Sequence, residues 1–208
     1  METSNIIGNI DSTTTDDGNV VVKSQNSIFS DSFCFQDYYD EALMRKFIKS
    51  TEAIIRQSKE YNDYLALIKT NYSILNYDNM MSHIGSGDAS IEIHHYPFTL
   101  YDIVEIVMSH HIARGDNFTS FDLAKEIMNL HFRHEIGFVP LTTTNHELAH
   151  DGAIFISTKQ IFGDWRKFAA EYDDGLNEDE REKAKRIVEL SDANCATDFN
   201  HLFSKGSD

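Results

Sequence analysis

Two histidines four residues apart, His146 and His150, place the strongest constraint on what this chain can fold into. On an α-helix, residues i and i+4 lie on the same face, so both imidazoles can reach one metal ion. Neutral imidazole binds Zn, Ni, Cu or Fe, and the spacing therefore predicts a metal site without identifying the metal. The helix should be short, because Pro140 and the β-branched Thr142–Thr144 disfavour helix before Asn145.

A second pair of histidines, His94 and His95, lies upstream. It follows Ile91 and Ile93, whose alternation predicts a short strand that ends at Pro97. In isolation, such a pair is more typical of satisfied residues at the end of a strand than of a ligand site.

Helices and further strands are expected around these two segments. Apolar residues recur at helical spacing over 37–60, 62–75, 100–113 and 121–134, and Trp165–Phe168 and Glu178–Leu190 also favour helix. Short strands are expected at Gly137–Leu141 and Ile154–Ile156. Four histidines in the predicted helices are more typical of surface or hydrogen-bonded core positions than of metal ligands: His110, His111, His131 and His134.

Composition limits the class of protein. The chain has 208 residues, 41% of them hydrophobic, and a formal net charge of −16. It has no apolar run of about 18 residues and no secretory signal, so we expect no membrane contact and a cytoplasmic location. Its two cysteines, Cys34 and Cys195, are far apart and form neither a zinc pair nor a disulfide framework. The charge is unfavourable for phosphate binding, which depends on Lys and Arg.

The sequence divides into four regions. We expect a disordered N-terminal arm (1–33), a helical hairpin (34–82), a core with the metal motif (88–160) that contains a helical insert (99–135), and a helical acidic C-terminal region (161–208).

The order of these features resembles the HNH, or ββα-metal (His-Me finger), endonucleases, and most closely the colicin-type nuclease domains. The resemblance covers His94–His95 and Gly137–Gly152, which includes the Val-Pro-Leu strand and the His-x-x-x-His helix; the spacer Tyr96–Ile136 is longer than usual. It implies an α+β fold in which a ββα-metal core at 88–160 carries an inserted helical pair beside the N-terminal helical hairpin.

The resemblance also implies a function. His95 would be the general base that takes a proton from the attacking water. His94, His146 and His150 would hold one divalent ion, Zn, Mg, Mn or Ni, which would polarise the scissile phosphate. The expected activity is metal-dependent hydrolysis of phosphodiester bonds in DNA, by a phage or mobile-element protein in the host cytoplasm. A basic partner protein could bring so acidic a chain to its DNA.

Gly137 departs from the family pattern. An Asn normally starts the second strand, nine residues before the first helix histidine, where it fixes the loop and orients the base. Glycine at this position predicts a substitute from elsewhere or a weakened enzyme. The candidate phosphate contacts are few: Arg114, Arg133, Lys159, Arg166 and Lys167.

Two other interpretations fit the same residues. His146–His150 also reads HExxH, as in zinc metalloproteases, with Glu147 as base and Glu171 as a distant third ligand. That interpretation leaves His94–His95 unexplained and needs helix where Pro140 forbids it. The other alternative is a metal-stapled interaction module without catalysis, in which metal binding contributes folding energy. The nuclease is the preferred interpretation.

Overall fold

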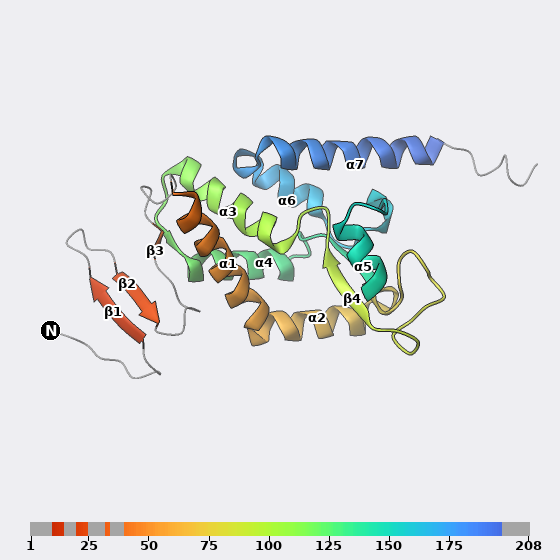
Figure 1. Cartoon of the computed structure of the whole chain (residues 1–208), viewed down its shortest axis with the longest axis horizontal. Coiled ribbons are helices and arrows are strands. Elements are labelled where there is room, and N and C mark those ends of the chain that lie inside the picture. The colour runs from red at the N-terminus through yellow and green to blue at the C-terminus, as the bar shows by residue number, and fades with distance from the viewer. Residues whose placement is uncertain (1–9, 15–19, 25–31, 34–39, 197–208) are drawn as a thin grey trace, which may run out of the picture.

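The structure is a computed structural model that describes residues 10–14, 20–24, 32–33 and 40–196 (Figure 1). The strands are β1 (Ile10–Thr14), β2 (Val20–Ser24), β3 (Ser32–Phe33), β4 (Ile91–His95), β5 (Phe118–Thr119) and β6 (Phe138–Thr142). The α-helices are α1 (Glu41–Gln57), α2 (Lys59–Asn71), α3 (Leu100–Arg114), α4 (Ser120–Phe132), α5 (Thr143–His150), α6 (Trp165–Glu171) and α7 (Glu178–Ala196). Short 3-10 turns are η2 (Ser73–Asn76), η3 (Thr158–Gln160) and η4 (Asp173–Gly175). The expected α+β class is confirmed.

Helices α1 to α4 form the main hydrophobic core. Helices α1 and α2 are separated only by Ser58, whose side chain accepts from the Tyr61 N–H and so starts the second helix where the first ends. Helices α3 and α4, the expected insert, each begin with a capping box, at Thr99 and Thr119. Their apolar stripes pack against α1 and are fully buried, for example at Ile103 of α3 and Leu123 of α4.

Strands β4 and β6 pair antiparallel, with Ile93 opposite Pro140. Successive side chains of a strand point to opposite faces of the sheet. On one face, Ile93 and Phe138 pack into the helical core. On the other face lies a smaller core cluster, against which α5 packs through Ala149; its members are Val139, Leu141 and Ile156. The two-stranded sheet therefore separates the helical core from α5.

Three expectations about local structure need correction. Ile154–Ile156 forms no strand among the described residues; Ile156 is buried by packing on the face of β6, without a ladder of its own. Helix α5 begins at Thr143, earlier than expected, because Thr142 caps it by accepting from the Asn145 N–H. Part of the arm expected to be disordered, 1–33, forms β1, β2 and β3, and its other positions lie outside the described residues.

Helix α7 lies along the upper edge of the molecule in Figure 1. It docks through a buried stripe that includes Ile187 and Ser191, and the Ser191 hydroxyl accepts from the Thr158 N–H at 2.9 Å. Glu180 is also buried in this stripe. Burial raises the pKa of Glu180 to about 7, although the hydrogen bond that its carboxylate accepts from the Asn177 N–H lowers the pKa. None of the helices in the described part of the chain is long and apolar enough to span a membrane.

Gly137 lies where the turn after β4 approaches the start of β6. The Tyr96 N–H donates to the Gly137 carbonyl at 3.0 Å. A Cβ on residue 137 would lie 2.0 Å from the Tyr96 carbonyl oxygen and 3.1 Å from the Trp165 Cβ. Backbone occupies the space that a side chain would need, so an asparagine cannot stand here in this backbone arrangement.

We expect Gly137→Ala to lower the free energy of unfolding by about 2–3 kcal/mol, because the overlap with the Tyr96 carbonyl forces the backbone to shift. Thermal and urea unfolding would measure the change. Gly87→Ala is the matched control, because nothing lies within 4 Å of its Cβ position, and it should change stability by about 0.5 kcal/mol or less. Equal effects of the two substitutions would contradict the steric role of Gly137.

Candidate metal centre

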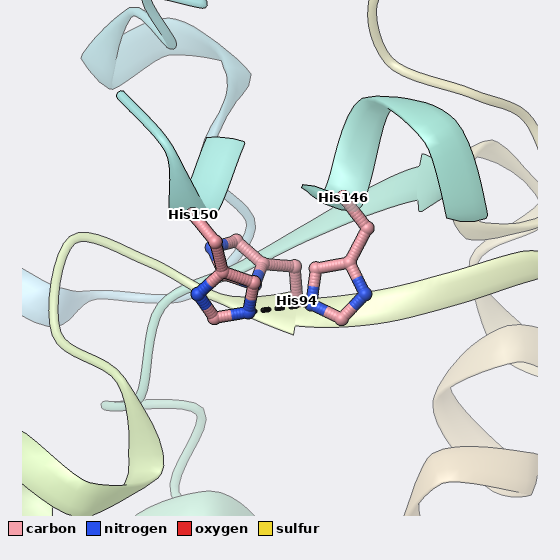
Figure 2. Close-up of side chains that lie close together, drawn as sticks. All are labelled: His94, His146 and His150. Carbon is pink, nitrogen blue, oxygen red and sulfur yellow. Dashed lines mark hydrogen bonds between the residues drawn. The ribbon is translucent and has the colours of Figure 1, made fainter. Parts of the chain in front are cut away.

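Three histidines from two elements converge on one point (Figure 2). His94 comes from β4, and His146 and His150 come from successive turns of α5. Their ligand nitrogens all lie within 4.8 Å of one another, and the ring centroids are 4.6–4.7 Å apart. Tetrahedral Zn²⁺ with Zn–N distances of about 2.0–2.1 Å needs nitrogens roughly 3.3 Å apart, so small side-chain rotations suffice. The structure brings together the three metal ligands expected from the sequence.

Glu92 fixes the tautomer of His146. The His146 Nδ1–H donates to Glu92 Oε2 at 2.5 Å, which leaves Nε2 without a proton and directed at the cluster. His150 Nε2 lies 3.1 Å from His146 Nε2, as the dashed line in Figure 2 shows. Glu92 also accepts from the Thr143 hydroxyl at 3.2 Å. A carboxylate behind a metal-binding histidine holds the ring in orientation and makes it a stronger ligand.

Sequence reasoning missed Glu92, although a signal was present. Glu92 and His94 are two apart in a strand, so they face the same side of the sheet. The acidic residue therefore lies beside the helix that carries His146.

His94 is kept in the neutral form that a metal needs. Its side chain is 6% exposed. Burial, and then the positive charges that His146, His150 and Lys183 can carry, lower its pKa to about 3. Metal ions compete with protons for the imidazole nitrogen. Because His94 is already neutral near neutral pH, a metal ion would bind it without displacing a proton.

The start of α5 is fixed by a buried carboxylate far upstream. Asp78, 1% exposed, accepts from the Thr142 N–H at 2.5 Å, and the Asn145 side-chain amide nitrogen donates to both of its carboxylate oxygens at 3.0 Å. Burial opposes ionisation of Asp78, but these hydrogen bonds outweigh it and hold its pKa below the ordinary value. The contact orients α5 on the sheet. Nothing in the sequence near Asp78 could have predicted a contact that only the tertiary fold creates.

His95 does not join the cluster. Its side chain is 5% exposed and lies on the helical-core face of β4, stacked on Tyr61. His131 donates from Nδ1 to the Ile127 carbonyl at 2.7 Å, so its Nε2 accepts the proton of His95 Nε2, 3.2 Å away. Burial, and then the charges that His131 and Arg56 can carry, hold the pKa of His95 well below its usual range. His95 and His94 both line a groove beside the cluster, but His95 Nε2 is engaged with His131, and its role as general base stays a prediction.

The five expected phosphate contacts lie away from the cluster and have partners in the fold. Arg133 and Lys167 both pair with the buried Glu135, at 2.7 and 2.6 Å. Arg114 lies 3.5 Å from Asp116, and the Arg166 guanidinium lies over the Trp165 ring. Lys159 lies in η3 and also has an interaction within the fold.

The other histidines in the helices serve the fold, as expected. His110 pairs with Asp174, and His111 lies 2.7 Å from Glu126. Their contacts, like that of His134 with Tyr64 at 3.1 Å, lie outside the cluster.

The geometry also weighs against the protease interpretation. Helix α5 has 8 residues, and Glu147 is exposed on it. Glu171, the expected third ligand, lies 3.5 Å from Arg133 instead. The third nitrogen comes from β4, through His94.

A groove of about 1190 Å³ opens beside the cluster. Its walls are the end of β4 with the turn that follows, the C-terminal end of α5 with residues 152–155, and α7. His94 and His150 both line it, so an ion held by the three histidines can present a further coordination position to the groove. Such an open position can bind water or an anionic ligand.

Comparison with known proteins gives one match. A family model described as bacteriophage G278-like virion protein matches residues 1–205. No curated protein and no solved structure matches the chain. The match confirms the expectation of a phage protein, and the chain belongs to the family of bacteriophage G278-like virion proteins.

Proposed function

We propose that this virion protein binds one divalent transition-metal ion through His94, His146 and His150. The convergence of three imidazole nitrogens within 4.8 Å carries the proposal. An all-imidazole ligand set suits Zn²⁺ better than Mg²⁺, which prefers oxygen ligands. The ion would tie α5 to β4, two elements that are otherwise joined by a small apolar cluster and by the Glu92 contacts.

Zn²⁺ should bind the purified protein with 1:1 stoichiometry and raise its thermal stability. With free metal 100–1,000 times above the dissociation constant, the gain is about 3–4 kcal/mol. Calorimetric titration and thermal unfolding would measure both. His146→Ala should remove binding, whereas His83→Ala, at an exposed turn position, should leave it intact. Unchanged affinity in His146→Ala would reject the site.

Glu92→Gln should weaken Zn²⁺ binding about 10- to 100-fold, because a neutral amide polarises the His146 ring less than a carboxylate does. A competition titration against a chromophoric chelator would measure the change. The matched control is Glu147→Gln, which removes the same charge from an exposed position next to His146. If the two variants bind zinc equally well, Glu92 has no role in the metal site.

A second candidate function, hydrolysis of phosphodiester bonds, is favoured by the open side of the cluster. The metal could lower the pKa of a bound water to about 7 and polarise a phosphate, as in other catalytic metal sites. In this candidate, His95 has no part as base, because its imidazole is committed to His131 in the core.

A plasmid-nicking assay with Mg, Mn, Ni or Zn at low salt tests this candidate; low salt preserves weak phosphate contacts. We expect metal-dependent nicking that is lost in His146→Ala and kept in His95→Gln, with folding and metal content verified for both. Loss of nicking in a folded, metal-bound His95→Gln would restore His95 as base. No nicking by protein that holds one metal ion would leave metal binding as the function of the site.

A further inference from the structure

The basic residues nearest the metal cluster come from α7. Lys183, Lys185 and Arg186 line the groove beside His94 and His150. The groove also contains Asp179, Glu182 and Glu189. Since the three positive and the three negative side chains balance, a long polyanion gains no net attraction from this wall. A single small anionic group that lies beside one well-placed cation is attracted to it.

Lys183 is the best placed of these cations. Its Nζ lies 3.5 Å from Asp102 Oδ2 on α3, and its side chain is 42% exposed. An ammonium group has three N–H donors, and one long contact does not use them all. Lys185, in contrast, lies opposite Glu189 on its own helix, with 3.9 Å between the charged atoms.

The position of α7, and with it of Lys183, is fixed by the fold. Glu180, three residues before Lys183, is buried, and its backbone N–H donates to Asn177 Oδ1 at 2.9 Å. Ile187, one turn after Lys183, is buried on the same side of α7 as Glu180. The charge of Lys183 also contributes to the lowered pKa of His94, after burial and the other two histidines. Lys183 lines the same groove as His94 and His150, so an anion bound in the groove can contact the ammonium and the metal ion together.

We infer that Lys183 and the metal ion together bind a phosphate group in the groove, with one phosphate oxygen on the metal and another accepting from the Lys183 ammonium. This inference rests on the proposed metal site. A bound phosphate oxyanion would complete the coordination of an ion held by three histidines and would neutralise the excess positive charge of the ion and Lys183.

Cobalt(II) in place of zinc gives a visible spectrum that responds to ligands on the metal. We expect inorganic phosphate to change the spectrum of the Co²⁺-loaded protein saturably. Lys183→Gln should weaken phosphate binding about tenfold or more, since it removes a charge-assisted hydrogen bond, while Co²⁺ affinity is unchanged or higher. Lys183→Arg should retain phosphate binding. Lys125→Gln, an equal charge change on the exposed side of α4, is the matched control.

The outcomes separate the two proposals. If wild-type protein binds no Co²⁺, the metal site itself is rejected. If Co²⁺ binds but phosphate leaves the spectrum unchanged, or if Lys183→Gln binds phosphate as tightly as wild type, the inference about Lys183 is overturned and the metal site stands.

Discussion

Side-chain alternation along β4 is the constraint on which the metal centre and the helical core both depend. The strand has a core on each side of it. Ile93 and His95 belong to the helical core, and Glu92 and His94 face α5. A shift of one residue in register would exchange these faces and would remove His94 from the cluster. The pairing with β6, which places His95 opposite Phe138, therefore fixes the ligand set as well as the fold.

Polar contacts then define the position of α5 on this sheet. Apolar packing between α5 and the strands is modest, and helix α5 spans only 8 residues. Asp78 holds the first turn through Thr142 and Asn145, and Glu92 holds the His146 ring. Carboxylates that accept several hydrogen bonds give such a contact directional specificity that apolar packing lacks. The three imidazoles are thereby arranged without an ion, which would reduce the entropy lost on binding the proposed metal ion.

Much of this arrangement could be predicted from local sequence patterns. The i, i+4 spacing of His146 and His150 and the apolar stripes are local features, and the helices and strands expected from local patterns are found close to the expected bounds, apart from Ile154–Ile156. His94 was identified through the resemblance to the HNH nucleases. The same resemblance led to His95 as general base, whereas alternation in a regular strand places neighbouring residues on opposite faces. His95 accordingly lies outside the cluster of His94, His146 and His150, and its role as base stays a prediction.

The missed features come from tertiary structure. Two of the expected phosphate contacts, Arg133 and Lys167, pair with the buried Glu135. Lys183 reaches the site because α7 folds back across the groove, and no local pattern specifies that docking. The role of Asp78 is of the same kind, since it contacts Asn145 across 67 positions of sequence.

Gly137 has a consequence for how the sequence of this chain can change. The Tyr96 carbonyl and the Trp165 Cβ occupy the volume that an asparagine at this position would need. A single substitution cannot recover the asparagine of the nuclease pattern without first moving the chain after β4 or the start of α6. A change toward that pattern thus requires coordinated changes in two segments of this chain.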